Sequence, residues 1–490
     1  MSSSTINCWK SILIGDDVRI GANCIIMDAD FHLDDPRVGN PKEIVIEDNV
    51  WLGANVVVLK GVHIGTNTII GMNSIVTKDI PANCIAAGSP CKIIKAMRII
   101  FILDNLYPNG RASAARVREY GKGFVANGIE TLVWLPTPRQ RYQDIGVINP
   151  ITKGIDENGV KYEYIAGSSK RNRNIFIRQL QDLYGYTATL FRLLTKCKRD
   201  DYVVVYEGSP RWFKNCVRAI RLAGAKCGME LNELPYGTGV ETDLTKKNRK
   251  VMLEKIFPKF DFIWAISSSL YVLAKQYAPQ AKIIKVPIMV EGQLEGADFK
   301  KQHVPYIFHS GTLYEQKDGI CGMLEAFGMA CQKLNTPVIY ILTGKLEESP
   351  HAEELKQIIS KYGIAERVKF VGYLDMSTLR KYQKNCFLTI INKYATQQNR
   401  YCFSTKLSEY LSFSRPVITT TVGEANNYLK DGVNAFIVEP HKPELIANKI
   451  VYAFSHPDET RKMGKEGHKL TEKEFDCVYQ TKRIIDYLKE

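Results

Sequence analysis

The chain has 490 residues, 45% of them hydrophobic and 24% charged, which is the composition of a globular protein with room for two or three domains. No apolar run approaches the roughly 20 residues that cross a bilayer, and residues 1–8 lack the basic and then apolar order of a signal peptide. The twelve cysteines form no CxxC pair, so the pattern suggests neither a zinc ribbon nor a disulfide framework, and we expect a reduced cytoplasm.

The net charge of +14 is spread over short basic clusters at residues 170–173, 196–199 and 246–250. These clusters lack the interleaved aromatic residues of a single-strand binder, and no zinc-finger or RNP signature is present, so we expect no nucleic-acid partner. Any one cluster is most simply solvated surface charge. Together they could dock the protein on an anionic membrane surface, peripheral to the inner face of the cell membrane.

Residues 1–96 contain a six-residue repeat. Aliphatic residues recur at Ile14, Ile20 and Ile26 and, after an excursion, at Ile46, Leu52, Val58, Ile64, Ile70 and Val76. Glycine often follows the aliphatic position, as at Gly15, Gly21 and Gly53. An inward apolar residue every six positions, with glycine at the corner, predicts a parallel β-helix.

This repeat and its closing segment at residues 71–92 resemble the hexapeptide-repeat O-acetyltransferases, which implies a left-handed β-helix, a homotrimer and acetyl-CoA as cosubstrate. The resemblance makes His32, in the excursion at residues 28–32, the base that deprotonates the acceptor hydroxyl, with Asp28 or Asp30 orienting the ring. It also supplies the CoA-binding candidates: Trp51 and Ala54 at the pantetheine channel, Lys78 and Lys92 at the CoA phosphates, and Ser74.

The repeat departs from that family in one respect. The family carries a substantial segment before these coils, whereas here the repeat begins almost at Met1, and the coils are few for a free-standing solenoid. The β-helix could therefore be a truncated remnant that is active only as a trimer, or a trimerisation scaffold without activity. Because Met97 resembles a natural start, the joined reading frame could itself be accidental.

Residues 97–287 begin a new pattern. A buried strand at residues 99–103, a break at 107–110, a helix from about 112 to 127 and a strand at 131–135 form a βαβ unit. Gly110 would let the backbone approach a phosphate at the helix N-terminus. Further strands are expected at 202–206 and 262–267, followed by loops that carry polar residues. We expect the helix at about 175–198 to pack an apolar face on the core rather than to enter a membrane.

Residues 288–490 alternate strands and helices in a doubly wound order. Strands are expected at 306–311, 338–344, 368–372, 387–391 and 417–421, with helices near 319–334, 353–362 and 477–488. The segment at residues 403–418 reads as a loop, a short helix with Lys406 and Glu409, and the start of a strand. Ligands of such sheets bind at this edge.

Residues 97–485 resemble the family-4 retaining glycosyltransferases, which implies the GT-B fold, a UDP- or GDP-sugar donor and no metal. Glu409 would hold the ribose hydroxyls and Lys317 would stabilise the leaving diphosphate, so these two are the catalytic candidates of this region. Further donor-binding candidates are Gly110, Gly311, Thr312, Gly344, Thr405 and Lys406, and the acceptor-side candidates are Glu207 and Glu233.

Two positions depart from the glycosyltransferase pattern. Thr312 stands where the family has arginine, and Tyr401 replaces the first glutamate of its E-x7-E motif. Lys406 and the backbone N–H groups near Ser404 and Thr405 could compensate for the missing cation.

The predicted fold class is α/β, with two Rossmann-like GT-B domains at residues 97–287 and 288–490 behind a short left-handed parallel β-helix at 1–96. The expected function is transfer of a sugar to a glycan or lipid-linked hydroxyl in bacterial surface polysaccharide synthesis, with an appended O-acetyltransferase. Two alternatives stay open: an acetyltransferase whose large region only binds nucleotide sugars, and a β-helix that serves only for trimerisation.

Overall fold

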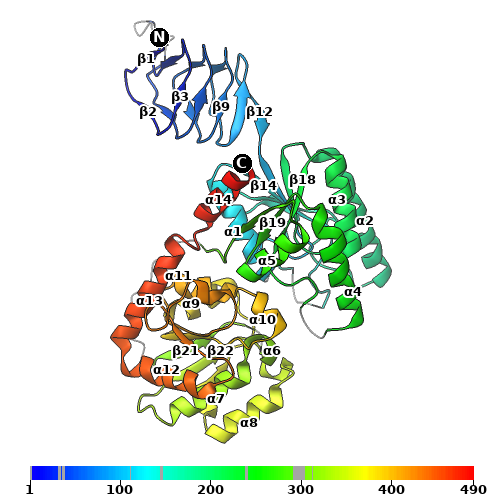
Figure 1. Cartoon of the computed structure of the whole chain (residues 1–490), viewed down its shortest axis with the longest axis vertical. Helices are drawn as coiled ribbons and strands as arrows, with labels where there is room; N and C mark the ends of the chain where they lie inside the picture. The colour runs from blue at the N-terminus through cyan, green and yellow to red at the C-terminus, as the bar shows by residue number, and fades with distance from the viewer. Residues whose placement is uncertain are drawn as a thin grey trace. The chain divides into compact units, whose positions relative to one another are not determined.

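The structure is a computed structural model that describes residues 3–30, 35, 39–110, 112–143, 147–237, 241–290, 304–311 and 313–489 (Figure 1). The chain divides into two compact units. Unit 1 comprises Met1–Gly110, Gly121–Glu207 and Asn215–Cys227, and unit 2 comprises Arg111–Tyr120, Gly208–Lys214 and Gly228–Glu490. The expected domain boundaries at 96/97 and 287/288 do not coincide with these divisions and stay a prediction.

Unit 1 begins with a stack of short strands that form three parallel sheets (Figure 1). Their orders are β1-β4-β7-β10, β2-β5-β8 and β12-β11-β9-β6-β3, and only the last pair, β11 and β12, is antiparallel. The strands are β1 (Thr5–Asn7), β2 (Ile12–Ile14), β3 (Arg19–Ile20), β4 (Ile25–Met27), β5 (Ile44–Ile46), β6 (Trp51–Leu52), β7 (Val57–Val58), β8 (His63–Ile64), β9 (Ile69–Ile70), β10 (Ile75–Val76), β11 (Cys84–Ala87) and β12 (Lys92–Ala96). The predicted parallel β-helix is confirmed.

The six-residue period sets the register of this β-helix. Leu52 pairs with Ile70, and the corner residue Asn55 donates to Asn73, 18 positions along the chain, so one coil uses three hexapeptides. The aliphatic residues of the repeat from Ile26 to Val76 form its closed core. Ile14, on the outermost coils, is instead 38% exposed.

The β-helix corners are built differently from the expectation. Asparagine or aspartate occupies most of the left-handed corner positions, and glycine occupies one, Gly61: the others are Asp17, Asn23, Asn49, Asn55, Asn67, Asn73 and Asn83. These residue types tolerate positive φ better than other non-glycine residues do. Glycine instead permits close stacking, since a Cβ on Gly53 would lie 2.7 Å from the backbone nitrogen of Met72 in the next coil.

The remainder of unit 1 contains a mostly parallel sheet in the order β15-β16-β14-β13-β17. The strands are β13 (Arg98–Ile102), β14 (Glu130–Leu135), β15 (Lys153–Ile155), β16 (Lys161–Tyr164) and β17 (Asp201–Val205). The helices of residues 97–227 are α1 (Ala112–Ala126), α2 (Ile175–Lys196) and α3 (Pro210–Leu222). The hydrophobic strand β13 is buried between two parallel neighbours, β14 and β17, as its apolar run predicts.

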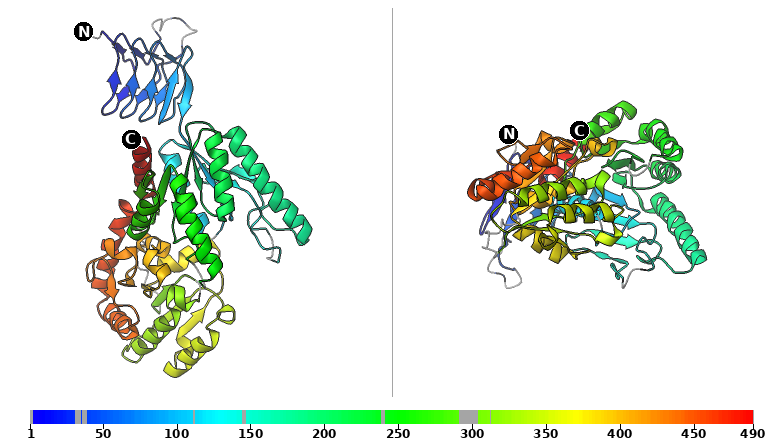
Figure 2. Two further views of the ribbon diagram at one scale, coloured as in Figure 1. Left: turned by 45° about the vertical axis from the view of Figure 1, so that its right-hand side comes forward. Right: turned by 90° about the horizontal axis from the view of Figure 1, so that it is seen from below.

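The structure corrects the expected packing of α2. Only Gly185, Thr189 and Leu193 of this helix are buried, whereas most of its other large apolar residues are exposed. Figure 2 shows α2 at the rim of its unit. The apolar spacing identified an amphipathic helix but not the direction in which its apolar face points.

Unit 2 contains a parallel six-stranded sheet in the order β23-β22-β21-β24-β25-β26. Its strands are β21 (Tyr306–His309), β22 (Ile339–Leu342), β23 (Val368–Phe370), β24 (Leu388–Ile391), β25 (Val417–Thr420) and β26 (Phe436–Val438). Residues of the strands β21, β22 and β24 and of two helices, α7 (Ile320–Cys331) and α12 (Pro443–Ser455), build its main hydrophobic core. This is the predicted doubly wound pattern.

Unit 2 also holds three further parallel strands and most of the helices. The strands are β18 (Lys226–Leu231), β19 (Phe262–Ala265) and β20 (Lys282–Lys285). The helices are α4 (Asp243–Val251), α5 (Ser268–Tyr277), α6 (Glu315–Asp318), α7 (Ile320–Cys331), α8 (Ala352–Tyr362), α9 (Met376–Asn385), α10 (Gln397–Tyr401), α11 (Thr405–Ser412), α12 (Pro443–Ser455), α13 (Pro457–Glu472) and α14 (Cys477–Lys489). None of the described helices is long and apolar enough to cross a membrane.

Candidate functional site

The carboxyl edge of the six-stranded sheet of unit 2 holds a tight glycine turn. Gly311 follows β21, and its N–H donates to Thr343 Oγ1 at 2.8 Å, just beyond β22. A Cβ on Gly311 would lie 2.3 Å from Lys406 Nζ and 2.9 Å from both Asp318 Oδ2 and His309 Nε2. Only glycine therefore fits, and its backbone lies against a group of charged side chains.

That group is a buried charge cluster, defined here as His309, Asp318, Lys393 and Lys406. Asp318 Oδ1 accepts from Lys406 Nζ at 2.8 Å and from Lys393 Nζ at 3.0 Å. Lys393 Nζ also donates to the Lys317 carbonyl at 2.6 Å. His309 Nε2 lies 4.0 Å from Asp318 Oδ2 and is a buried ring nitrogen without a hydrogen-bond partner among the described residues.

The ionisation of the cluster follows from its burial. Burial alone would raise the pKa of Asp318, but the ammonium groups of Lys406 and Lys393 outweigh it and hold that pKa well below its ordinary value. Burial lowers the pKa of His309 to about 3, and Lys406 adds to this effect. Two ammonium groups thus face one carboxylate and a neutral imidazole, which leaves an excess of one positive charge beside Gly311.

Helix α11 carries three of the candidates, Thr405, Lys406 and Glu409. Glu409 Oε2 accepts from Gln383 Nε2 of α9 at 2.6 Å, and burial raises the pKa of this carboxyl group. Thr405 and Glu409 line one pocket of about 60 Å³ together with Arg380 and Gln383. The side chain of Ser404 makes no capping bond, so the N-terminus of α11 adds its partial positive charge to this edge.

The side chain of Lys317 is not part of the charge cluster, although the Lys317 carbonyl accepts a hydrogen bond from Lys393. The Lys317 side chain is exposed and lines a pocket of about 440 Å³ with Tyr236, Tyr314 and Thr396. The next residue, Asp318, occupies the buried position, because α6 ends there and Gly319 turns the chain with a positive φ of 60°. Gly344, with φ of 93°, donates its N–H to the Gly372 carbonyl. Thr312 lies outside the described residues.

The two acceptor-side candidates, Glu207 and Glu233, lie in different units, and Gly110 lies in the same unit as Glu207. Gly110 and Glu207 belong to unit 1, where Glu207 accepts a hydrogen bond from Asn105 Nδ2 at 3.3 Å. Glu233 belongs to unit 2 and is half-buried in the loop after β18. Their acceptor roles stay predictions.

The acidic residues of the β-helix excursion are already engaged. The carboxylate of Asp28 accepts the backbone N–H groups of Trp9, Lys10 and Ser11 at 2.6–2.8 Å. Burial would raise the pKa of Asp28, but these hydrogen bonds outweigh it and lower that pKa. Asp30 pairs with Lys60. His32 lies outside the described residues, so its role as a base stays a prediction.

The CoA candidates fall into two classes. Trp51 is 51% exposed on β6, and Lys78 and Lys92 are exposed after β10 and on β12. Ala54 is half-buried at a corner. Ser74 is buried, and its hydroxyl donates to the Gly71 carbonyl and accepts the Gly88 N–H, so it braces the coil.

Comparison with known sequences finds family matches in both parts of the chain. Residues 295–470 match the family described as glycosyl transferases group 1. Residues 43–78 match the bacterial transferase hexapeptide family, and residues 11–27 match the hexapeptide repeat of succinyl-transferase. The chain carries a group 1 glycosyltransferase domain behind hexapeptide repeats. Both predicted resemblances are confirmed at this level, and the family-4 subclass stays a prediction.

The hexapeptide part of this glycosyltransferase-domain chain is similar to curated acetyltransferases. It is 45% identical over 87 residues to the galactoside O-acetyltransferase of Lactococcus lactis, which is 17% of this chain and 42% of that protein. It is 42% identical over 89 residues to the galactoside O-acetyltransferase of Escherichia coli K12, which is 17% of this chain and 44% of that protein. The chain thus spans less than half the length of these relatives.

Solved structures share the fold of the glycosyltransferase region. Sucrose-phosphate synthase of Thermosynechococcus elongatus superposes with a TM-score of 0.61 at 14% identity, over 81% of this chain and 98% of its own. The Anabaena protein HepE, in complex with UDP and glucose, gives a TM-score of 0.59 at 15% identity, over 80% and 100%. These likenesses confirm the predicted GT-B fold.

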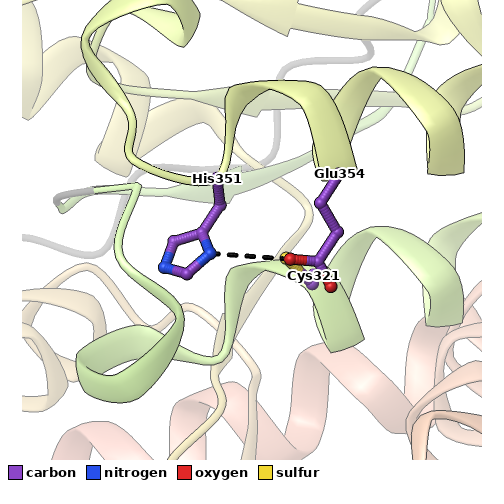
Figure 3. Close-up of side chains that lie close together, drawn as sticks. All are labelled: Cys321, His351 and Glu354. Atoms are coloured by element: carbon purple, nitrogen blue, oxygen red, sulfur yellow. Dashed lines mark ion pairs between the residues drawn. The ribbon is translucent and has the colours of Figure 1, made fainter.

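One group of side chains in unit 2 has the ligand types of a metal site. Cys321, His351 and Glu354 bring a thiol, an imidazole and a carboxylate within 4.8 Å of one another (Figure 3). Such donors suit Zn²⁺. However, His351 Nδ1 lies 3.5 Å from Glu354 Oε2, and burial together with Glu315 and Glu354 raises the pKa of the Cys321 thiol. The three groups therefore also fit together without a metal, as a neutral thiol beside an imidazole–carboxylate contact.

Sequence reasoning missed three members of the charge cluster: His309, Asp318 and Lys393. Their positions carried a signal, since each lies at or just beyond the carboxyl end of a strand or at a helix junction on one sheet edge. The motif resemblance instead directed attention to Lys317, one position before the residue whose side chain turns inward.

Proposed function

We propose that the chain transfers a sugar from a nucleoside diphosphate sugar to a hydroxyl acceptor. One observation carries this proposal: the buried cluster of Lys393, Asp318 and Lys406, with its excess positive charge, lies against Gly311 at the carboxyl edge of the sheet. A leaving diphosphate gains negative charge in the transition state, and preorganised cations in a buried site stabilise it.

The residues then have distinct roles. Lys406 and Lys393 would neutralise the diphosphate together with the N-terminus of α11, and Glu409 would accept hydrogen bonds from the ribose hydroxyls. Lys317, at the mouth of its own pocket, would contact the outer part of the donor. The proposed reaction retains configuration: the bond from the anomeric carbon to the diphosphate breaks, and the acceptor oxygen attacks the same face of an oxocarbenium-like sugar. The hydroxyl proton passes to the departing phosphate oxygen. No metal is required, since the lysines supply the positive charge.

Ligand-induced thermal stabilisation tests this proposal. Purified protein would be heated with UDP, GDP, ADP and CDP singly, because a ligand bound to the native state raises the midpoint. A response to one nucleotide identifies the base, and we expect Glu409→Ala to abolish it. Glu325→Ala is the matched control, since Glu325 is also a half-buried helical glutamate, paired with Lys361 at 3.8 Å. An unchanged thermal midpoint with every nucleotide would refute a nucleotide-dependent function.

A second activity, acetyl-CoA-dependent O-acetylation by a trimer of the β-helix, is favoured by the similarity to galactoside O-acetyltransferases. We expect acetyl-CoA to stabilise the protein and Trp51→Ala to remove that response. Trp9→Ala is the control, since Trp9 is 63% exposed on the same β-helix. A trimer without any acetyl-CoA response would leave the β-helix as a scaffold.

The biological setting is part of the proposal. Sugar transfer and O-acetylation both occur in bacterial surface polysaccharide synthesis, where the acceptor is a glycan or a lipid-linked sugar. We place the reaction in the cytoplasm, at the inner face of the membrane. Transfer to a lipid-linked acceptor in detergent, measured against a soluble oligosaccharide, would separate the two acceptor classes.

A further inference from the structure

The inner side of α2 is held by polar contacts and close backbone approach. Tyr186 donates to Asp104 Oδ2 at 2.7 Å, and Arg192 forms two bonds of 2.7 and 2.8 Å with Glu163. At Gly185 a Cβ would lie 1.9 Å from the Pro136 carbonyl oxygen. The inner side of α2 therefore packs on the rest of unit 1 through small and polar residues and one buried leucine, Leu193.

The opposite side is apolar and exposed. We define the outer face of α2 as Phe176, Leu180, Leu183, Tyr184, Phe191 and Leu194, whose exposed fractions run from 46% to 72%. Intervals of three, four and seven residues place all six on one side of the helix. The helix has 22 residues, so this face extends over roughly 30 Å.

An amphipathic helix ordinarily packs its apolar face on the core and exposes its polar face, whereas α2 does the opposite. Apolar residues scattered singly over a surface need no explanation, but a continuous apolar stripe marks an interaction site. The neighbouring exposed residues Ile175 and Ile177 extend the stripe at its start. Because no described helix can cross a bilayer, a lipid partner would have to be met in the interfacial plane.

Charge indicates which partner fits. The basic residues Lys170, Arg171 and Arg173 precede the helix, and Lys196, Lys198 and Arg199 follow it. The acidic residue of α2, Asp182, lies 3.4 Å from Arg171, so it is neutralised beside the first cluster. An apolar stripe with cationic ends matches a surface with a hydrocarbon interior and anionic headgroups.

We propose that α2 lies in the interface of an anionic lipid bilayer, with its outer face among the acyl chains and its basic ends at the headgroups. This surface does not depend on the nucleotide chemistry of unit 2. It gives the protein a fixed orientation at the membrane, and it assigns two of the basic clusters to lipid contact.

Sedimentation with vesicles tests the proposal on the full chain. The vesicles contain phosphatidylcholine with or without phosphatidylglycerol, at low and high salt. We expect binding to the anionic vesicles that weakens with salt. The variant Phe176→Ser/Leu180→Ser/Leu183→Ser should bind at least about tenfold more weakly. The matched control is Leu222→Ser/Leu244→Ser/Val272→Ser, whose positions are 65% to 79% exposed on other helices, and it should bind like the wild type.

Charge variants separate the two parts of the interaction. Lys196→Gln/Lys198→Gln/Arg199→Gln should lose the preference for anionic vesicles while the thermal midpoint is unchanged. A wild type that stays in the supernatant overturns the proposal, as does an outer-face variant that sediments like the wild type. A dimer in the absence of lipid, dissociated by the outer-face variant and without vesicle binding, would assign this face to a second copy and also overturn it.

Discussion

Replacing Lys406 by glutamine tests the charge cluster directly. The substitution removes one of the two ammonium groups that face Asp318, so the excess positive charge beside Gly311 falls to zero. A hydrogen bond to a charged group contributes about 1.5–3 kcal/mol. We therefore expect Lys406→Gln to weaken binding of the preferred nucleoside diphosphate by roughly 10- to 100-fold.

The same substitution should leave the fold intact. Removing one partner from a buried ion pair costs about 3–5 kcal/mol when the remaining charge is left alone. Asp318 keeps Lys393 at 3.0 Å, so we expect the loss in unfolding free energy to stay below about 3 kcal/mol. Chemical denaturation measures this loss and separates it from the effect on binding.

Calorimetric titration with the monophosphate and diphosphate of the same nucleoside distinguishes a phosphate contact from general damage. Lys406 should act on the diphosphate, so the monophosphate affinity should change by less than about threefold. Lys333→Gln, at an exposed lysine that bonds to Asn448, is the control. An unchanged diphosphate affinity in Lys406→Gln, or an equal loss for both nucleotides, would refute the assigned role.

Three further predictions follow from the same structure. The pKa of His309 is about 3 in the native state against an ordinary 6.5, so the unfolded state binds a proton first as the pH falls. The contribution of neutral His309 to the free energy of unfolding is therefore fully present above pH 6.5 and is lost as the pH falls towards 3. This contribution should reach at most about 5 kcal/mol. His309→Gln should flatten the slope of unfolding free energy against pH between these two pH values. Asn55→Ala, at a φ of 59°, should lower stability by about 1–2 kcal/mol while Asn55→Gly lowers it less, as denaturant titration would show. Sugar transfer should persist after dialysis against EDTA, and a loss restored by a divalent cation would contradict a reaction based on lysine.

The fold was largely predictable because its signals are periodic. The six-residue recurrence in the β-helix and the alternating strands and helices of residues 306–421 each record which residues must be buried. The residue type at the β-helix corners was harder to predict from the sequence. Glycine was interpreted as the corner residue, but it adopts the left-handed conformation at Gly61, whereas asparagine does so at most corners, such as Asn55 and Asn73. A period identifies the inward position but not the backbone conformation of the residues between.

The candidate site was predictable in location but not in its charged members. The sequence placed Gly311, Lys406 and Glu409 near the carboxyl edge of the sheet, and they lie there in the structure, while their roles stay a prediction. Which residue of the turn points inward depends on where α6 ends, and a one-residue difference exchanges Lys317 for Asp318. The direction of the α2 apolar face was hidden for a similar reason, since the helical spacing of Leu180 and Leu183 is the same for a core contact and a lipid contact.

The departure at Thr312, where the resembled family has arginine, bears on the charge balance of the cluster. Without the arginine of the resembled family, the glycine turn has one cation fewer, and the buried carboxylate of Asp318 lowers the net positive charge there further. Lys393 and Lys406 come from separate elements, the end of β24 and the start of α11, and together they overcompensate for that carboxylate. If this exchange preserves donor binding, an arginine introduced at position 312 should restore part of the diphosphate affinity lost in Lys406→Gln. Failure of that double variant to recover affinity would mean that the cation must come from α11, where the helix N-terminus acts on the same phosphate.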